Sequence, residues 1–312
     1  MKVFEGFEKA FEVNYPVVTI GTFDGVHLGH QKIISRLNEE AEEFDGESTL
    51  FTFYPHPRLV LYPDSTNLKL LQTREEKIAK LERMGLKNML IYPFTREFSR
   101  LTATEFVRDI LVNQMKVKKI VIGYDHQFGK NREGGLEFLR EVSEIYDFEV
   151  IEIPAQDIDD VNVSSTKIRK ALLDGDVETA KTFLTEPYEI NGIVIKGEAI
   201  GRTIGYPTAN IQVDSKLKLI PKNGVYACEV MVRDNERFQA MVNIGSRPTV
   251  SNSEAISIEV HLLDFDKDIY GEKLRIHFHS FVRDERKFEN LEMLSKQLEN
   301  DKVLVRSILS AL

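Results

Sequence analysis

The chain of 312 residues contains a single cysteine, Cys228. One thiol cannot build a disulfide framework or a cysteine-based metal site, so nothing here requires an oxidising compartment. The sequence also lacks any apolar run near the ~20 residues of a membrane-spanning helix, and its first residues lack the apolar run of a signal peptide. We therefore expect a cytoplasmic protein without a membrane partner.

The chain has no excess of positive charge: 50 acidic residues outnumber 41 lysines and arginines, which gives a net charge of −9 at pH 7. A protein whose main partner is DNA or RNA usually presents a basic surface, so no nucleic acid is expected as a partner. A small anion such as ATP remains compatible with this charge, because a few local cations and a metal ion suffice to bind it. The length, together with 42% hydrophobic residues, favours two domains with separate cores.

Strand-like and helix-like segments alternate in the first half. Apolar runs predict strands over residues 17–20, 50–53, 89–92, 119–122 and 149–153, and amphipathic patterns predict helices over 28–44, 73–84, 103–115 and 136–146. Thr73 is the expected N-cap of the second helix, with Glu76 at the capping-box position. The alternation is typical of an α/β Rossmann-like domain, a doubly wound parallel sheet whose ligands bind beyond the carboxyl ends of the strands.

The pattern changes after Pro187. Two short helices over residues 164–184, with a break near 174–176, precede closely spaced strands over 188–195, 224–233, 238–245, 256–263 and 274–281, and a helix over 288–309. Strands without intervening helices indicate a small antiparallel β-barrel or sandwich, here followed by a C-terminal helix. We place the boundary so that the domains are residues 1–186 and 187–312.

The most informative segment is GTFDGVHLGH, residues 21–30, directly after the first strand. Its glycines allow close backbone approach, and the helix that follows offers free N–H groups and a positive dipole end to a phosphate. His27 and His30 share one helix face and can stabilise charge on a phosphorus atom during transfer. The glycine pattern is neither Gly-x-Gly-x-x-Gly nor a Walker loop, which argues against a dehydrogenase and a P-loop kinase. In the alternative interpretation, the histidines cap the helix or bind a metal.

Three other segments fit the same domain. SSTKIR, residues 164–169, opens a helix with hydroxyls and an arginine, which suits an anion cradle, although a simple N-cap with a surface arginine explains it too. GYDHQFGKNR, residues 123–132, follows the fourth strand and could hold a nucleoside at the same sheet edge. FYPHP, residues 53–57, follows the second strand and is either a binding segment or a rigid turn.

Two segments of the second half suggest phosphate chemistry. GRTIGYPTAN, residues 201–210, contains Thr208 and Asn210, whose oxygen atoms suit Mg²⁺ held jointly with phosphates. Glu259 lies in an alternating strand with its apolar neighbours facing the other side, so it could act as general base for a substrate hydroxyl. The alternatives are a hairpin loop with an Asn turn and a solvated strand residue.

These motifs carry a resemblance to a known family. GTFDGVHLGH with SSTKIR resembles the HxGH nucleotidyltransferases, and FYPHP and GYDHQFG are similar to motifs of the adenylyltransferase module in bacterial bifunctional riboflavin kinase/FAD synthetases. PTAN at residues 207–210 resembles the riboflavin kinase domain, as do NGVY at 223–226, NIGSRPT at 243–249 and the Glu259 strand. Ser257 stands where that family pattern has threonine.

The resemblance implies two reactions. A six-stranded barrel would phosphorylate riboflavin with ATP to give FMN and ADP, and the first domain would join FMN and ATP into FAD and pyrophosphate. Mg²⁺ is the expected cofactor. The implied catalytic residues are His27, His30 and Glu259, with the histidines acting on the α-phosphoryl group and the glutamate on the riboflavin 5′-hydroxyl.

The resemblance also suggests binding residues. For ATP in the first domain these are Gly21, Phe23, Asp24, Gly25, His27, His30, Ser165, Thr166 and Arg169. For flavin or nucleotide in that domain they are Phe53, Pro55, His56, Pro57, Asp125 and Phe128. For ATP and Mg²⁺ in the kinase they are Gly201, Gly205, Thr208 and Asn210, the last two as metal ligands, and for kinase flavin or nucleotide they are Arg283 and Glu285.

Two other functions stay open at this point. The chain could be a different adenylyl- or cytidylyltransferase of the same superfamily, with the barrel serving only as a binding module. It could also be a flavin-sensing regulatory protein that binds FMN without consuming ATP. The presence of His27, His30 and Glu259 speaks against a sensor, because binding alone does not need them.

Overall fold

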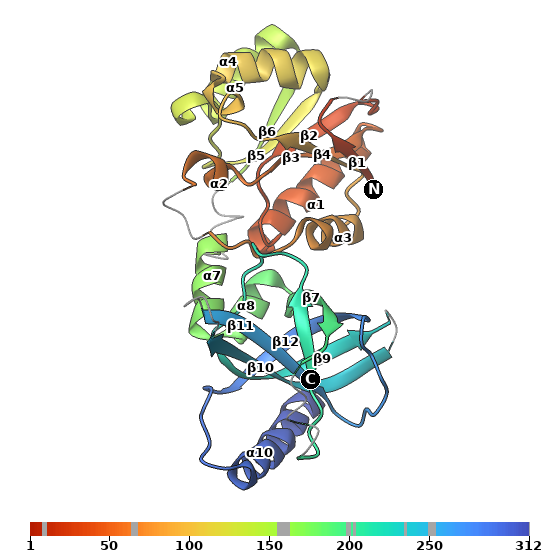
Figure 1. Ribbon diagram of the computed structural model, residues 1–312. Helices are drawn as coiled ribbons and strands as arrows, with labels where there is room; N and C mark the ends of the chain where they lie inside the picture. Colours follow the sequence, from red (N-terminus) through yellow and green to blue (C-terminus); the bar gives the residue numbers. More distant parts are fainter. Residues whose placement is uncertain are drawn as a thin grey trace. The chain divides into compact units, whose positions relative to one another are not determined.

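The chain forms two compact units, residues Met1–Ser164 and Ser165–Leu312, and each is described by itself (Figure 1). The computed structural model describes residues 1–7, 11–63, 68–154, 163–197, 201, 204–233, 236–248 and 254–311. Arg202, Thr203 and Thr249, which belong to motifs noted above, lie outside these ranges.

A parallel sheet forms the centre of the first unit. Its strands are β1 (Lys2–Glu5), β2 (Pro16–Ile20), β3 (Glu47–Tyr54), β4 (Asn88–Pro93), β5 (Lys119–Gly123) and β6 (Glu149–Ile153). They lie in the order β1-β4-β3-β2-β5-β6, and all neighbouring pairs are parallel. The five predicted strands are confirmed. The edge strand β1 was missed, because its four residues are mostly exposed and carry no apolar run.

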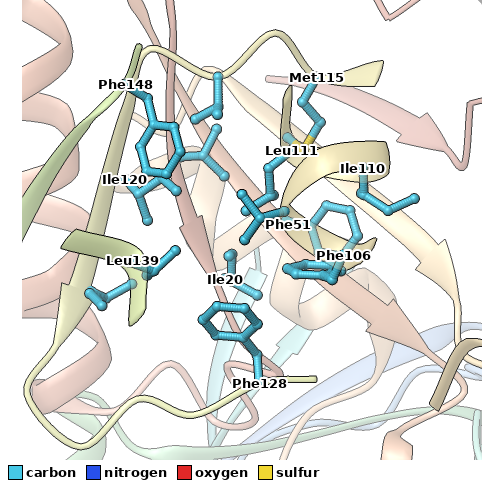
Figure 2. Packing of buried hydrophobic residues seen from close by; sticks show 14 of the residues in the cluster. Ile20, Phe51, Phe106, Ile110, Leu111, Met115, Ile120, Phe128, Leu139 and Phe148 are labelled. Carbon is cyan, nitrogen blue, oxygen red and sulfur yellow. The ribbon is translucent and has the colours of Figure 1, made fainter. Parts of the chain in front are cut away.

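Helices cover both faces of this sheet, as expected for a doubly wound fold. They are α1 (Leu28–Glu43), α2 (Pro57–Leu61), α3 (Arg74–Arg83), η1 (Phe98–Arg100), α4 (Ala103–Glu105), η2 (Phe106–Gln114), η3 (Lys130–Arg132) and α5 (Leu136–Tyr146). Alternate strand residues divide between two cores: Val17 packs with residues of α1 and α3, and Val18 packs with residues of η2 and α5. Figure 2 shows the second core, in which Ile20, Phe51 and Ile120 of the sheet meet side chains of the covering helices.

Two helices of this unit, α3 and the one predicted over residues 103–115, show how far the sequence patterns reach. The capping box of α3 is confirmed: Thr73 Oγ1 accepts the Glu76 N–H at 3.2 Å, and the Glu76 carboxylate accepts the Thr73 N–H at 2.9 Å. The helix predicted over residues 103–115 exists, but from Phe106 onward it is a π-helix, with the Met115 N–H donating to the Ile110 carbonyl at 2.9 Å. Apolar periodicity does not separate these two helix types.

The strand order places two predicted segments next to each other. On either side of β2 lie β3 and β5, so the direction in which strands are added to the sheet reverses at β2. In open parallel sheets this switch point, at the carboxyl ends of the strands, is where ligands bind. The loops after β2 and β5 both begin there.

The second unit is a closed antiparallel barrel with helices before and after it. Helices α7 (Ser165–Asp174) and α8 (Val177–Leu184) come first, and α10 (Leu291–Ser310) comes last. The strands are β7 (Tyr188–Ile195), β8 (Ala209–Val213), β9 (Gly224–Val232), β10 (Glu236–Pro248), β11 (Glu254–Leu262) and β12 (Lys273–Arg283). They close in the order β10-β11-β8-β7-β12-β9, which confirms the predicted barrel and its C-terminal helix.

Strand β8 was missed by the sequence prediction. Residues 201–210 were expected to form a loop, but Ala209 and Asn210 already belong to β8, which pairs with both β7 and β11. Its five residues are partly polar, so no clear alternation marks them. Helix α10 begins three residues later than predicted, where the Asn290 side chain caps it by accepting the Met293 N–H at 2.9 Å.

Helices α7 and α8 group with the barrel. Helix α8 contacts β7 and β12, and the Lys222 N–H just before β9 donates to the Leu172 carbonyl of α7 at 3.0 Å. The two structural units therefore divide at residues 164/165. The functional domain boundary at 186/187 stays a prediction.

Candidate active sites

The loop after β2 has a tightly constrained backbone. The Gly21 N–H donates to the Phe51 carbonyl at 3.0 Å, and a Cβ on Gly21 would lie 2.8 Å from the Phe23 ring. Phe23, Gly25 and Val26 all have positive φ, at 48°, 91° and 40°. Burial of the Phe23 and Val26 side chains in the core on one face of the sheet offsets the cost of this strained conformation. The loop is thus held in one shape, and it ends at His27.

The two predicted histidines form a stack. His27 is the N-cap of α1, and its ring lies over that of His30 with centroids 3.7 Å apart and planes inclined by 18°. Phe23 also stacks on the His30 ring, at 4.5 Å. The predicted shared helix face is therefore present, at the N-terminal end of a helix that starts at the sheet's switch point.

The environment of His30 keeps its ring neutral. Burial lowers the pKa of His30 well below its usual value, and the positive charges of His27, Lys77 and Lys80 lower it further. Within the described part of the chain, the buried Nδ1 atom of His30 has no hydrogen-bond partner. A neutral imidazole next to a helix N-terminus can donate one N–H to a phosphate oxygen without adding charge to the ring stack.

Asp24 anchors a neighbouring segment of the chain. Its buried carboxylate accepts the Leu71 N–H at 3.0 Å and the Gln72 N–H at 3.4 Å. These contacts fix the residues that lead into α3. A direct contact between Asp24 and ATP stays a prediction.

Lys77 of α3 was missed by the sequence interpretation. Its ammonium donates to the Thr22 carbonyl at 3.0 Å and lies 3.5 Å from the Thr52 hydroxyl. Burial lowers the pKa of Lys77 to about 8, although the Asp24 carboxylate raises it in part. Charged residues surround this lysine in the sequence, so no pattern distinguished it from an exposed one.

The segment after β3 combines a turn with a short helix. The Tyr54–Pro55 peptide bond is cis, and Pro57 is the first residue of α2. His56 caps that helix, since its Nδ1 accepts the Arg58 N–H at 3.2 Å. Phe53 packs against Phe51 and Phe94, with ring centroids 5.3 and 5.4 Å away. The rigid-turn interpretation describes the backbone, and the ligand roles of this segment stay predictions.

The loop after β5 places its two predicted residues differently. Asp125 is exposed. Phe128 is buried in the core against Phe106, at 5.4 Å between centroids, and its backbone forms an isolated antiparallel bridge with Gly134. Phe128 therefore anchors the loop, while Asp125 is free to meet solvent or ligand. Binding by either residue stays a prediction.

Ser165, Thr166 and Arg169 lie in the first turns of α7, in the second unit. Thr166 is exposed, and Ser165 and Arg169 are half-buried. The helix start expected from SSTKIR is confirmed. Phosphate binding by these three residues stays a prediction.

Three predicted kinase residues meet on the outer face of the barrel. Glu259 of β11 lies opposite Asn210 of β8 in register, and the Thr208 hydroxyl donates to the Glu259 carboxylate at 3.4 Å. Ile258 and Val260 are buried on the other face of β11, and Glu259 is half-buried. The strand alternation expected for Glu259 is confirmed.

Glycine is required at two positions of the preceding loop. Gly205 has φ of +81°, and a Cβ on Gly201 would lie 2.2 Å from the Tyr206 carbonyl oxygen. The Gly201 carbonyl accepts the Tyr206 N–H at 2.8 Å, which closes the turn. These two glycines shape the loop that delivers Thr208 to Glu259.

His261, two residues after Glu259, was missed. Its Nδ1 lies 2.8 Å from the Pro207 carbonyl, and its ring lies 5.2 Å from that of Tyr206. The Tyr206 hydroxyl donates to Glu299 of α10 at 2.5 Å. Burial lowers the pKa of His261, so the ring is neutral at pH 7 and donates through Nδ1. The only sequence signal was its place on the Glu259 face of the strand.

A cavity of about 450 Å³ lies beside this cluster. Its walls come from the Thr208 loop, from β11 and from the acidic turn that follows β11; the residues are Val194, Pro207, Thr208, Ala209, Val260, Leu262, Phe265, Asp266, Lys267, Asp268, Ile269 and Tyr270. Cavities of this size accept nucleotide-sized ligands. Thr208 borders the cavity and also contacts Glu259, so it links the two.

Comparison with known proteins finds one family in each half of the chain. The FAD synthetase family profile matches residues 12–167, and the riboflavin kinase profile matches residues 184–309. A bifunctional riboflavin kinase/FMN adenylyltransferase from Listeria monocytogenes is 39% identical over 95% of this chain and 93% of its own. The enzyme of that name from Escherichia coli is 35% identical over 93% and 91%.

The chain belongs to the bifunctional riboflavin kinase/FMN adenylyltransferase family. A crystal structure described as a macrolide-efflux protein from Streptococcus pneumoniae shares its fold over 98% of this chain and 99% of that one, with 32% identity and a TM-score of 0.89. In the present chain, no helix within the described ranges is long and apolar enough to cross a membrane.

In this bifunctional family member, Arg283 is committed to an ion pair. It makes a bidentate contact with the buried Asp301 of α10, with N–O distances of 2.7 to 3.0 Å. Its remaining nitrogen donates to the Asp284 carbonyl at 3.1 Å. Glu285 is exposed, and its carboxylate lies over Gly245, where a Cβ would come within 2.3 Å. Flavin or nucleotide contacts of Arg283 and Glu285 stay predictions.

The oxygen atoms of the kinase cluster suit a hard cation. Thr208 and Asn210 supply a hydroxyl and an amide oxygen, and the Glu259 carboxylate lies beside them. Among the described residues, no group of three or more His, Cys, Asp or Glu side chains is arranged to hold a metal. This donor set therefore fits Mg²⁺ shared with phosphate groups better than a cation held by protein ligands alone.

Proposed function

We propose that Glu259 activates riboflavin in the second unit and that His27 and His30 carry out adenylyl transfer in the first. The family membership assigns the two activities, riboflavin kinase and FMN adenylyltransferase, to the chain. The observation that supports the residue assignment is the pair of clusters: Glu259 with Thr208 in one unit, and the stacked histidines in the other.

In the kinase step, the Glu259 carboxylate accepts the proton of the riboflavin 5′-hydroxyl as that oxygen bonds to the γ-phosphorus of ATP. The bond to the ADP oxygen breaks, and FMN and ADP result. The cavity beside Thr208 receives the nucleotide, so that its phosphates reach the Glu259 side of the strand. Thr208 and Asn210 would hold Mg²⁺, which would neutralise phosphate charge there.

In the adenylyl step, a phosphate oxygen of FMN attacks the α-phosphorus of ATP, and pyrophosphate leaves. His27 and His30 donate N–H groups to the oxygens that gain charge at the α-phosphorus. The first turn of α1 adds free amides and the positive end of its dipole. Backbone shape at Gly21 and Gly25 lets the phosphates approach closely.

The other predicted residues complete this proposal. Ser165, Thr166 and Arg169 hold the leaving pyrophosphate, and residues 53–57 with Asp125 and Phe128 position the flavin or the nucleoside. Because both steps consume ATP, and because a lone buried cysteine needs no oxidising compartment, we also propose a cytoplasmic location.

A product assay tests the proposed function. The full chain is incubated with riboflavin, ATP and Mg²⁺, and flavins are separated by chromatography. Both FMN and FAD are expected, with FMN appearing first. FMN alone would leave only the kinase half of the proposal, and the absence of both products would overturn it.

A further inference from the structure

Lys77 lies beneath the loop that carries the histidine pair. Its Nζ donates to the carbonyl of Thr22, the second residue of that loop, at 3.0 Å. The Thr52 hydroxyl of β3 lies 3.5 Å both from the same carbonyl and from the Lys77 ammonium. One half-buried cation therefore connects α3, β3 and the loop after β2.

A lysine in this position is energetically unfavourable. Burying an ammonium group without full compensation costs free energy, and the pKa of Lys77 is accordingly lowered to about 8. A methionine would fill the same space without that cost. Ionisable groups whose pKa values are shifted in this way occur preferentially at functional sites.

Binding a ligand directly is the weaker explanation for this lysine. The cavity that Lys77 borders with Thr22, Thr52 and His56 has a volume of about 40 Å³. That is room for about one water molecule, whose share of liquid volume is ~30 Å³, and not for a flavin ring. The two hydrogen-bond acceptors of Lys77 are both protein groups. A role in fixing the protein's own loop agrees better with these contacts.

The loop fixed by Lys77 determines where the histidines lie. Residues 22–26 include three positive φ angles, so small backbone shifts would change the direction of entry into α1. The charge of Lys77 also acts on His30, whose ring stacks on His27 at 3.7 Å. Two protonated rings at that separation would repel each other strongly.

We propose that Lys77 is a positioning residue of the adenylyltransferase site: its ammonium holds the Thr22 carbonyl in place and so fixes the loop that leads to the stacked histidines. This inference rests on the proposed role of His27 and His30. It assigns to Lys77 no contact with substrate. Its effect on the reaction passes through the geometry of the two rings.

Other charged groups around Lys77 must be considered in any pH dependence. Asp24 faces it from the loop after β2 and favours its charge, while Arg74 on its own helix opposes it. His30 lies on α1, Lys80 lies one turn further along α3, and His56 borders the same cavity. The pKa of His30 is lowered well below its ordinary value, whereas that of Lys77 is lowered to about 8, so Lys77 changes its charge between pH 7 and 9.5.

The test uses the full chain with Lys77→Met, which keeps length and apolar volume but removes the charge and the donor. FAD formation from added FMN is expected to fall ~10- to 100-fold in kcat, the range for loss of a hydrogen bond from a charged group. The KM values for ATP and FMN should change less than threefold, because substrate contacts are retained. FMN formation from riboflavin, measured on the same protein, should stay within twofold and shows that the chain is folded.

Proton NMR titration of the seven histidines measures the pKa of His30, which would not change if Lys77 only stabilised the fold. The signal of His30 is assigned with His30→Gln. Its pKa should rise in Lys77→Met, and rise less in the matched variant Lys80→Met, because Lys77 contributes more than Lys80 to lowering it. An unchanged His30 pKa together with an unchanged kcat would overturn the inference.

The native enzyme provides a test that needs no folded variant. Lys77 is charged below its pKa of about 8 and neutral above it. The rate of FAD formation, divided by the rate of FMN formation, should therefore decline as pH rises through 8. A ratio that stays constant from pH 7 to 9.5 contradicts the inference. His30→Ala separates the two proposals. If this variant still forms FAD, the proposed function is wrong. If it loses FAD formation while Lys77→Met keeps full activity, only the role of Lys77 is wrong.

Discussion

Thr208 lies just before β8, and its hydroxyl donates to the Glu259 carboxylate of the neighbouring strand β11 at 3.4 Å. Thr208 also borders the large cavity, so one side chain contacts both the proposed base and the space proposed for ATP. A general base must lie within reach of the hydroxyl it deprotonates and of the phosphate that the hydroxyl attacks. In the proposed kinase step, Thr208 therefore connects the base to the nucleotide in the cavity.

Glu259→Gln is expected to remove the base and preserve the cluster. The amide oxygen still accepts the Thr208 hydroxyl, but it cannot take a proton. FMN formation should fall by ~10²–10⁴, the usual contribution of a general base. FAD formation from added FMN, measured by chromatography, should be unchanged. If the variant kept more than a tenth of the kinase rate, Glu259 would have another role.

His261 is expected to act on the kinase loop through the Pro207 carbonyl, which its Nδ1 meets at 2.8 Å. His261→Leu removes this hydrogen bond and should slow FMN formation roughly 3- to 10-fold, in line with one neutral hydrogen bond. His261→Asn places an amide N–H near the position of Nδ1 and should restore most of the rate. Equal rates in the two variants would show that the hydrogen bond is unimportant.

The sequence predicted most elements because their apolar residues repeat with the period of a strand or helix. The same spacing argument brought His27 and His30 together on one helix face, and the strand alternation put Glu259 opposite its apolar neighbours. Lys77 and His261 could not be found this way. Each is an ordinary polar residue of a regular element, and only the three-dimensional packing determines that Lys77 meets the Thr22 carbonyl and that His261 meets the Pro207 carbonyl.

Non-local pairing explains the other gaps. Strand β8 is stabilised by β7 on one side and β11 on the other, so its short, partly polar sequence suffices. Phe128 belongs to a glycine-rich segment that resembles a ligand loop, yet its ring joins the core with Phe106. A motif therefore predicted the place of the loop without showing which of its residues face a ligand.

His30→Ala tests the first site. The substitution removes one ring of the stack and should lower FAD formation from FMN by ~10²–10³, the cost of losing one donor to a transition state. FMN formation from riboflavin should remain within twofold, since Glu259 lies in the other unit. Loss of both activities in a protein that unfolds with the native Tm would contradict separate sites.

Helices α7 and α8 are expected to be needed for the stability of the barrel. Val177, Ala180 and Leu184 of α8 are almost fully buried, and α8 contacts β7 and β12. Burial of one large aliphatic side chain contributes ~1.5–3 kcal/mol, so removing Val177 and Leu184 should cost about 3–6 kcal/mol. Because small domains have only ~5–15 kcal/mol of unfolding free energy, that loss is a large fraction of the total.

Two fragments separate the possibilities. Residues 165–312 are expected to unfold cooperatively and to convert riboflavin and ATP into FMN at a rate near that of the full chain. Residues 187–312, which follow the predicted domain boundary, should have a much lower Tm or fail to fold, as measured by circular dichroism. Equal Tm values for the two fragments would mean that the barrel is stable without α7 and α8. The boundary at 186/187 would then be the better division of the chain. Helices α7 and α8 would belong to the adenylyltransferase domain, for which Ser165 and Arg169 are proposed to bind pyrophosphate.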